Sequence, residues 1–359
     1  MQSLIQAVIN KYEASPVRLL HILREVQAEF QHISPEAIEL IASGLNIPRT
    51  QIISVVEFYN FLHLTPRGQY DILISDSITD HMLGKQNLMN YFANQLQVTI
   101  GEVRPDGLVN LDSTSCTGMC DQGPAGLVNG YALTHLDRPR IDAIAQLIEQ
   151  ETPIEQWPTE FFAVNDNIYK AGLLLQSPIE KGEALKARYQ RGLTETLSEI
   201  DISGLRGRGG AGFKTAMKWR FCSEEVENER YVVCNADEGE PGTFKDRVLL
   251  NSYAHQVFEG MTVCASIIGS EQGFLYLRGE YLHLFEKLQN ILVERREAGL
   301  LGANISGQDL SFDIEIRLGL GAYICGEESA LIESLEGKRG IPRNRPPYPV
   351  SQGYLNKPT

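Results

Sequence analysis

The sequence has little cysteine, little tryptophan and no long apolar run. Six cysteines in 359 residues are too few for a disulfide scaffold, which is dense in cysteine. The longest apolar runs, such as residues 261–269, fall well short of the roughly 20 residues that a bilayer span needs, so we expect no transmembrane segment. The N-terminus lacks the unbroken apolar core of a secretory signal, because Asn10, Lys11 and Glu13 interrupt it. The reducing cytoplasm is therefore the expected compartment.

Positive charge is also scarce. The chain has 32 Lys and Arg against 46 Asp and Glu, a formal net charge of −14. Such an excess of acid argues against a partner with a phosphate backbone, so we expect no nucleic-acid partner. Hydrophobic residues make up 43% and charged residues 22% of the chain, which is typical of a globular protein rather than a disordered one. At roughly 150 residues per domain, two or three domains are expected.

Residues 1–65 predict a small helical bundle. Ser15-Pro16 places a proline at the start of one apolar helical repeat, and Ser34-Pro35 does the same for a second. Pro48 begins a third helix that is expected to end near Phe61. The apolar stripes of these helices indicate that they pack together.

Residues 66–155 predict a small α/β domain. Its expected strands are 70–74, 98–101, 108–111 and 127–133, and its expected helices are 81–95 and 138–150. Asn129-Gly130 is a favoured two-residue hairpin turn. This pattern is compatible with a thioredoxin-like fold. Pro153 and Pro158 then open a connector, which we place at residues 156–199.

Residues 200–359 predict a second α/β domain. Its expected strands are 231–234, 274–277 and 312–317, and its expected helices are 213–222, 247–268, 281–297 and 328–335. Alternation of this kind favours a largely parallel sheet with helices on its faces. The expected fold class is α/β, with a helical bundle and a thioredoxin-like domain ahead of a Rossmann-like α/β domain.

Glycine is concentrated in a segment that predicts a ligand site. Residues 204–213 run Gly-Leu-Arg-Gly-Arg-Gly-Gly-Ala-Gly-Phe and contain a G-x-G-x-x-G pattern. A dinucleotide fingerprint follows a buried strand, but residues 198–203 are short and polar, so we reject an ordinary Rossmann site. Consecutive N–H groups near a helix start, with Arg206, Arg208 and Lys218 close by, favour a phosphate or the face of a flat ring. The alternative is a tight turn with solvated arginines.

Two further segments place acids after buried strands. Asn235-Ala236-Asp237-Glu238-Gly239-Glu240 follows the expected strand 231–234, and ligands of open α/β sheets lie beyond such strand ends. Its oxygens can accept ribose or ribityl hydroxyls, although a solvated acidic turn is the alternative. Residues 319–328 repeat the pattern of strand, glycine loop and acids before a helix. Helix capping is the alternative for Glu327 and Glu328.

With these motifs the chain resembles a known family. Residues 200–359 resemble the flavoprotein that oxidises NADH at the tip of respiratory complex I. Residues 1–155 resemble the partner of that flavoprotein. That likeness is carried by Gln27-Ala28-Glu29-Phe30, Phe58-Tyr59 and Cys116-Thr117-Gly118-Met119-Cys120-Asp121-Gln122-Gly123-Pro124. Both halves in one chain resemble the diaphorase subunit of bacterial NAD-reducing nickel–iron hydrogenases.

The resemblance implies two cofactors, FMN and NAD(H), with hydride transfer between them and electrons passed on to iron–sulfur clusters. By motif match, the residues implied at FMN are Gly207, Arg208, Gly209, Lys218, Asn235, Asp237, Glu238, Tyr323, Gly326 and Glu327. Those implied at NADH are Phe213, Phe221, Glu240, Glu328, Arg345 and Tyr348. Glu240 would position the nicotinamide. No catalytic acid or base is assigned, because the cofactors carry the chemistry.

Two departures from the family concern its clusters. The family's thioredoxin-like domain holds a 2Fe–2S cluster on two cysteine pairs. Cys116 and Cys120 match the second pair, but Ser75 and Asp80 stand at the first, followed by His81. Hydroxyl and carboxylate are harder ligands for such a centre. We therefore favour a degenerate docking domain over a residual cluster on Cys116 and Cys120.

The second departure lies at the end of the sequence. Family members continue beyond the position of Thr359 into a further flavin contact and a 4Fe–4S domain, so this chain is expected to be C-terminally truncated and to lack that cluster. The remaining four cysteines have no C-x-x-C spacing and are expected to be core residues.

The resemblance also implies partners. These are the iron–sulfur electron-transfer subunit of the diaphorase and, through it, the nickel–iron hydrogenase subunits. The flavoprotein of complex I or of an NAD-dependent formate dehydrogenase is an alternative context with the same motifs. An alternative of another class is a non-catalytic assembly or docking subunit whose glycine loop holds no cofactor.

Overall fold

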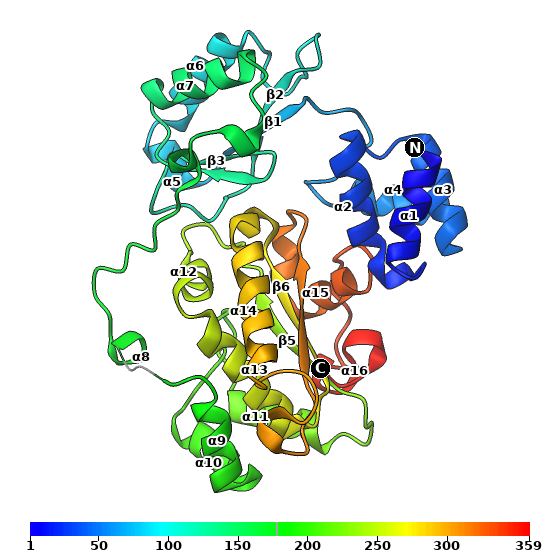
Figure 1. Cartoon of the computed structure of the whole chain (residues 1–359), viewed down its shortest axis with the longest axis vertical. Helices are drawn as coiled ribbons and strands as arrows, with labels where there is room; N and C mark the ends of the chain where they lie inside the picture. Colours follow the sequence, from blue (N-terminus) through cyan, green and yellow to red (C-terminus); the bar gives the residue numbers. More distant parts are fainter. Residues whose placement is uncertain (177–178) are drawn as a thin grey trace.

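The structure, a computed structural model, describes residues 1–176 and 179–359. Figure 1 shows three parts: N-terminal helices, a small α/β unit, and a larger α/β unit that contains the C-terminus. The predicted α/β class is confirmed. None of the helices in the described ranges is long and apolar enough to cross a bilayer.

The N-terminal helices after the first begin at or shortly after the prolines that the sequence marks. They are α1 (Gln2–Lys11), α2 (Leu19–Phe30), α3 (Pro35–Leu45) and α4 (Arg49–Val56), with a 3-10 turn at Pro16–Arg18. The Ser34 hydroxyl accepts the N–H of Ala37 at 3.1 Å and caps α3, as Ser, Thr, Asp and Asn commonly do. The third predicted helix ends at Val56 rather than near Phe61.

The small α/β unit has one sheet with strand order β2-β1-β3-β4. Its elements are β1 (Tyr70–Ser75), α5 (Ile78–Met82), α6 (Lys85–Leu96), β2 (Val109–Thr114), β3 (Gly126–Val128), β4 (Tyr131–Leu133) and α7 (Arg138–Glu149). Strands β1 and β2 are parallel, and the other neighbours are antiparallel. The predicted hairpin is confirmed, because Asn129 and Gly130 both have positive φ, as a type I′ turn requires.

Two predictions for this unit are wrong. Residues 98–101 form a turn instead of a strand, because left-handed Gln97 and Gly101 reverse the chain on either side of the buried Val98. The single helix predicted at 81–95 is two helices, separated at Gly84, whose φ of 86° no α-helix allows.

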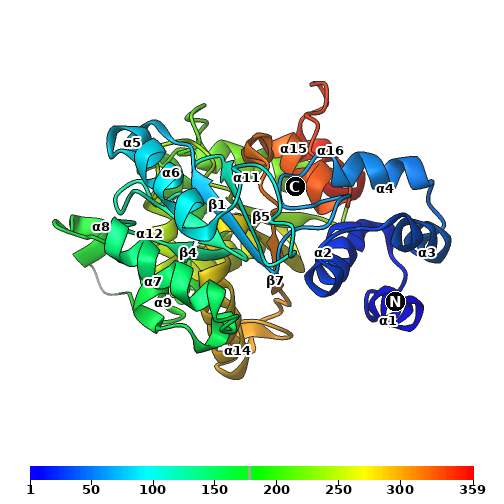
Figure 2. The same cartoon turned by 90° about the horizontal axis from the view of Figure 1, so that it is seen from above.

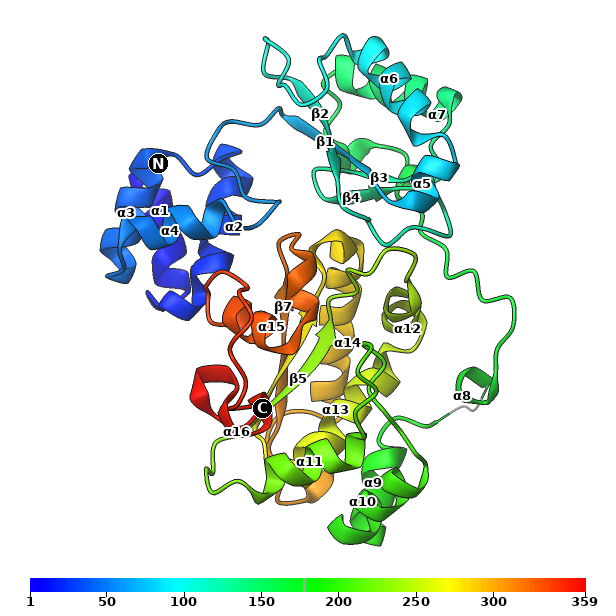
Figure 3. The ribbon, with the colours of Figure 1, turned by 180° about the vertical axis from the view of Figure 1, so that it is seen from behind.

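The residues between α7 and position 176 run along the outside of the molecule, and those from 183 to 202 lie at the far end of the larger unit, as Figure 3 shows. It contains α8 (Leu173–Gln176), α9 (Glu183–Arg191) and α10 (Leu193–Ile202). Leu185 and Leu197 are buried in the core of the larger unit. The last part of the predicted connector therefore forms helices that pack against the larger unit. The domain boundaries at 65, 155 and 199 stay predictions.

The larger unit is built on a parallel sheet of order β5-β6-β7. Its elements are α11 (Thr215–Glu224), β5 (Tyr231–Ala236), α12 (Lys245–Ser252), α13 (Ala254–Ile268), β6 (Gln272–Leu277), α14 (Phe285–Glu297), β7 (Asp313–Leu318), α15 (Glu328–Leu335) and α16 (Pro349–Gln352). The parallel sheet is confirmed. The predicted helix 247–268 is two helices that meet at Tyr253, and the helix predicted from residue 281 starts at Phe285, after a 3-10 turn at Gly279–Leu284.

The two faces of this sheet are covered by different parts of the chain. Val232 and Leu275 point into a core shared with α13 and α14. Their strand neighbours Tyr231 and Phe274 point the other way, into a core shared with the N-terminal helices and α15, as the two-residue period of a strand requires. Figure 2 shows those N-terminal helices beside α15 and α16. Because the three strands are parallel, the C-terminal ends of β5, β6 and β7 lie side by side at one edge of the sheet.

Candidate functional site

The glycine-rich segment 204–213 forms a narrow exposed loop. The N–H of Gly207 donates to the carbonyl of Phe213 at 2.9 Å and holds the two arms together. A Cβ added to Gly209 would meet no atom within 4 Å, and the backbone there is not left-handed. Packing within the chain therefore does not require glycine at 209, whereas a ligand lying against the backbone would.

The cations near this loop have different surroundings. Arg206 donates to the carbonyl of Gly212 at 2.8 Å and stiffens the loop. Arg208 is exposed. Lys218, on α11, lies 2.6 Å from a carboxylate oxygen of Glu328 at the start of α15. The glycine loop, residues 204–213, and the glycine-acid segment, residues 319–328, are therefore linked through α11.

The two segments that place acids after strands, residues 235–240 and 319–328, meet directly at the edge of the sheet. The side-chain amide of Asn235 donates to the carbonyl of Gly326 at 2.8 Å. The Tyr323 hydroxyl donates to the Glu240 carboxylate at 2.5 Å. The structure thus brings together four residues that the sequence predicted at one site, from the ends of two strands.

Asp237 lies between these contacts with a buried carboxylate oxygen. Its Oδ2 has no hydrogen-bond partner among the described residues. Loss of hydration, and then the nearby carboxylate of Glu280, raise the pKa of Asp237 to about 7. Buried polar atoms without a partner are rare in native proteins. A hydroxyl or N–H group of a ligand would satisfy this oxygen.

Two residues predicted at FMN have structural contacts within the chain. The Glu238 carboxylate is buried and accepts the N–H of Asp246 at 3.0 Å and the hydroxyl of Tyr281 at 2.9 Å. It thereby holds the start of α12. Glu327 caps α15 by accepting the N–H of Ala330 at 3.0 Å, so the capping interpretation holds for it. Both acids therefore have structural partners in the chain, and their role at FMN stays a prediction.

The residues predicted at NADH lie around the glycine loop and α15. The Arg345 guanidinium lies 3.1 Å from a carboxylate oxygen of Glu328. The same carboxylate also contacts Lys218. The rings of Phe213 and Phe221 lie 6.4 Å apart and are tilted by 50°. Phe213 is 48% exposed, Phe221 42% and Tyr348 54%. The exposed faces of these rings are available for stacking.

Sequence reasoning missed the residues that follow the middle strand. Arg278, directly after β6, is buried. Its guanidinium donates to the carbonyls of Cys116 and Glu238 and contacts the Glu280 carboxylate at 3.0 Å. The available signal was Arg278-Gly279-Glu280, a charged stretch after a buried strand, between the two strand ends already singled out.

The small α/β unit packs against this edge through residues 116–122. Arg247 is 0% exposed and contacts both carboxylate oxygens of Asp121, at 2.8 and 2.9 Å. A Cβ on Gly118, which has a φ of 76°, would lie 2.4 Å from the hydroxyl oxygen of Tyr281. The loop that carries Cys116 and Cys120 is therefore held tightly beside the candidate site.

Cys116 and Cys120 lie close together, beside the other two positions at which the family resemblance implies cluster ligands. Their sulfurs are 3.1 Å apart. The other two family positions hold Ser75 and Asp80, which bond to each other at 2.5 Å. Asp80 also accepts the N–H of Ala125 at 3.0 Å. Within residues 1–176 and 179–359, no group of three or more His, Cys, Asp and Glu is arranged to hold a metal ion.

The two thiols differ in acidity. The contact from Cys116, and to a lesser extent the N–H of Gly242, lower the pKa of Cys120 to about 6, although burial opposes this. The same contact, reinforced by burial, raises the pKa of Cys116. Of the other cysteines, Cys222, Cys264 and Cys325 are buried and Cys234 is half-buried, in agreement with the core role that the sequence predicts.

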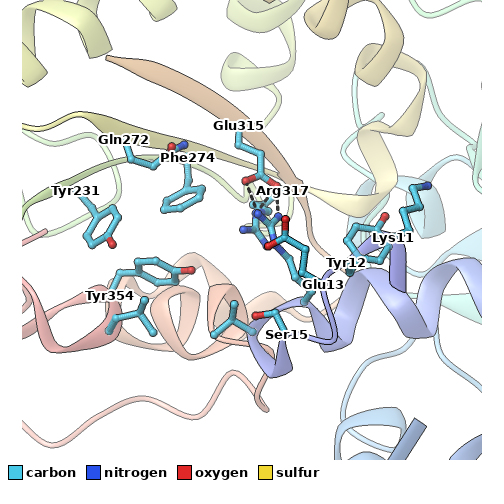
Figure 4. Close-up of a pocket in the computed structure, with 13 residues that line it drawn as sticks. Lys11, Tyr12, Glu13, Ser15, Tyr231, Gln272, Phe274, Glu315, Arg317 and Tyr354 are labelled. Carbon is cyan, nitrogen blue, oxygen red and sulfur yellow. Dashed lines mark hydrogen bonds and ion pairs between the residues drawn. The ribbon is translucent and has the colours of Figure 1, made fainter. Parts of the chain in front are cut away.

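A cavity of about 440 Å³ lies away from all these residues. Figure 4 shows it between the first helices and the sheet, with Tyr231, Phe274 and Tyr354 on one side and Arg317 bonded to Glu315. None of its lining residues was predicted at a cofactor. We place the candidate site at the strand ends, because the convergent polar groups and the open glycine loop are there.

Comparison with known proteins gives matches over both halves of the chain. Residues 200–356 match the Nuo51 FMN-binding domain. Residues 5–149 match the thioredoxin-like 2Fe-2S ferredoxin family. The NAD-reducing hydrogenase HoxS subunit alpha of Cupriavidus necator is 40% identical over 381 residues, covering 100% of this chain and 62% of that protein. This chain is similar to the NAD-reducing hydrogenase alpha subunit over its whole length.

Two further comparisons agree with this relationship. A chain in the crystal structure of the NAD+-reducing NiFe hydrogenase in the H2-reduced state superposes with a TM-score of 0.88 and 41% identity, over 96% of this chain and 58% of that chain. An NADH-quinone oxidoreductase subunit of Salmonella typhimurium is 48% identical over 166 residues, 46% of this chain and 37% of that protein. The resemblance predicted from the motifs is confirmed. The chain spans about three fifths of the length of the hydrogenase subunit.

Proposed function

We propose that this chain carries the NAD(H) and FMN site of a diaphorase that exchanges electrons with a hydrogenase through iron–sulfur partners. The observation that carries the proposal is the glycine loop, whose residue 209 has no packing reason to be glycine, next to two strand ends joined by the Asn235–Gly326 and Tyr323–Glu240 contacts. A match to the Nuo51 FMN-binding domain covers the same residues.

The residues present fit FMN. The open backbone at Gly209 allows close approach of a flat ring, and the unpartnered oxygen of Asp237 suits a ribityl hydroxyl. Exposed Arg208 supplies a cation for the phosphate. Asn235 would fix the position of the Gly326 loop. When bound, FMN supplies hydride acceptance and one-electron transfer.

The residues on the nucleotide side would orient NAD(H) rather than donate protons. The hydrogen bond from Tyr323 fixes the Glu240 carboxylate, which suits contact with the nicotinamide amide. Phe213, Phe221 and Tyr348 offer exposed rings for stacking. Lys218 and Arg345 are paired with Glu328 here, so a bound pyrophosphate would have to draw these cations from that carboxylate.

The hydrogenase context is part of the proposal. The likeness to the hydrogenase subunit extends over the whole chain, whereas the likeness to the quinone oxidoreductase subunit covers about the second half. An iron–sulfur electron-transfer subunit and, beyond it, the hydrogenase subunits are the proposed partners. The degenerate thioredoxin-like unit would serve as a docking part rather than a cluster carrier.

Binding of FMN to the 359-residue chain tests the proposal. Titration should quench flavin fluorescence, and NADH should bleach the bound flavin. Gly209→Val should abolish FMN binding, since a side chain would occupy the open space against the backbone, while urea unfolding of the FMN-free protein stays within about 0.5 kcal/mol of the parent. Gly172→Val, also at an open glycine, is the control and should bind FMN normally. A parent chain that does not bind FMN would favour a non-catalytic docking subunit.

A further inference from the structure

The former cluster position in the small α/β unit has been closed by its own side chains. The Asp80 carboxylate is buried and accepts the hydroxyls of Ser75 and Ser77, each at 2.5 Å, and the N–H of Ala125. Both carboxylate oxygens of Asp80 therefore accept hydrogen bonds from within the unit. Cys116 and Cys120 lie side by side, and among the described residues they belong to no group of three or more His, Cys, Asp or Glu that could hold a metal ion.

This thiol pair has an asymmetric environment. Cys116 is 3% exposed, whereas Cys120 is partly exposed. The Cys120 sulfur accepts the N–H of Gly242 at 3.2 Å, from the loop of the larger unit that also carries Glu240. The carbonyl of Cys116 is held by the buried guanidinium of Arg278. Cys120 is thus the partly exposed residue of the pair, and Cys116 is the buried one.

We infer that Cys116 and Cys120 form a redox-active dithiol that is oxidised reversibly to an intramolecular disulfide by low-molecular-weight disulfides. The sulfurs need to approach from 3.1 Å to about 2.0 Å, the length of a disulfide bond. Pairs of this kind in reducing compartments are usually catalytic or redox-sensing rather than structural.

The oxidation takes place in two thiol–disulfide exchange steps. The Cys120 thiolate attacks one sulfur of the external disulfide, whose S–S bond breaks; one thiol leaves with the proton that Cys120 gave up. The Cys116 sulfur then attacks the Cys120 sulfur of the mixed disulfide, and the second external thiol leaves with the proton of Cys116. Two protein thiols are oxidised to one disulfide, and one external disulfide is reduced to two thiols.

Thiol mapping of the full 359-residue chain tests this inference. The reduced protein is incubated with glutathione disulfide, free thiols are alkylated, and the tryptic peptide that contains both cysteines is weighed. The expected product is lighter than the dithiol peptide by two hydrogen atoms, is resistant to alkylation, and returns to the dithiol on reduction. The other four cysteines serve as internal controls and should remain reduced.

Two variants test the assigned order of attack. Cys116→Ser should retain glutathione on Cys120, because no second thiol displaces it. Cys120→Ser should leave Cys116 unmodified, since Cys116 is buried. Far-ultraviolet circular dichroism checks that both variants fold. Glutathione trapped in Cys120→Ser instead of Cys116→Ser would overturn the assignment of the attacking sulfur.

Two results on the parent chain would overturn the inference as a whole. The first is the absence of an intramolecular disulfide in any glutathione redox buffer. The second is stoichiometric iron and acid-labile sulfide in protein purified without oxygen, with both cysteines protected from alkylation. The Gly209→Val variant keeps this test separate from the proposed function, since it should form the disulfide normally while failing to bind FMN.

Discussion

At the scale of single residues, the candidate site is marked by features that internal packing does not explain. Gly209 has room for a side chain that the sequence does not use. Asp237 buries an oxygen with no partner in the described part of the chain. Glu238, which follows Asp237 directly, is fully engaged under α12. Neighbouring acids in one motif therefore have different surroundings: one keeps an oxygen without a partner among the described residues, and the other holds the start of a helix.

The buried carboxyl of Asp237 should make the stability of the FMN-free protein depend on pH. Its pKa of about 7 in the folded state lies above the roughly 3.9 of an unfolded chain, so the folded state holds the extra proton between these values. Stability should therefore fall as pH rises from about 4 to 7 and stay low above that. Asp237→Asn should remove this slope and be more stable than the parent at pH 8, by on the order of 2–4 kcal/mol.

Urea unfolding of parent and variant across this pH range measures the effect. Asp309→Asn, at an exposed position, is the matched control and should leave the slope unchanged. If the free energy of unfolding depended on pH in the same way for the parent and Asp237→Asn, the Asp237 carboxyl would have no raised pKa in the folded protein.

At the scale of elements, the ends of three parallel strands determine where the site can be. The loops after β5 and β7 contact each other through Tyr323 and Glu240. The loop after β6 supplies Arg278, which bonds to the carbonyl of Glu238. Helix α12 begins on the Glu238 carboxylate. The loops after the three strands are therefore linked by hydrogen bonds of a few polar and charged side chains.

Glu238→Gln should destabilise the FMN-free protein by about 2–3 kcal/mol, because an amide would replace a carboxylate oxygen that accepts backbone N–H groups at a helix start. Glu240→Gln, at the exposed acid two residues further on, is the control and should change stability by less than about 0.5 kcal/mol. Urea unfolding distinguishes the two. Unchanged stability of Glu238→Gln together with lost FMN affinity would favour the ligand role that the sequence motif predicts.

At the scale of the whole molecule, the three parts of the chain share cores and contacts. The N-terminal helices cover one face of the β5-β6-β7 sheet. The small α/β unit is fastened to the same sheet edge by the Arg247–Asp121 pair. The proposed dithiol therefore lies where two parts of the molecule meet, beside the loop that carries Glu240.

Asp121→Asn should weaken this junction severely. Arg247 is fully buried, and a buried charge that loses its partner costs about 3–5 kcal/mol. Thermal unfolding and limited proteolysis between the two α/β units should both reveal the loss. Glu39→Gln, which breaks the exposed pair with Arg49, is the control and should cost less than about 1 kcal/mol. Equal stability of Asp121→Asn and the control variant would mean that the pair does not hold the units together.

Much of the fold and part of the site could be predicted from the sequence. Periodicity located most helices and the three parallel strands, and Asn129-Gly130 specified a hairpin, because these patterns record local geometry. Residues 98–101 were mistaken for a strand, since a short apolar run does not reveal the turns at Gln97 and Gly101. Charge patterns alone could not distinguish Glu238 from Asp237.

The sequence by itself determined the α/β character, the glycine loop and the acids at two strand ends, because each depends on residues close together along the chain. Only the tertiary structure decided which of those acids remain free, that Arg278 reaches the Cys116 carbonyl 162 positions away, and that Cys120 faces the loop bearing Gly242. Local patterns fix which surfaces must be buried. Which buried surfaces meet is set by packing between distant segments, and that pairing placed the thiols beside the site.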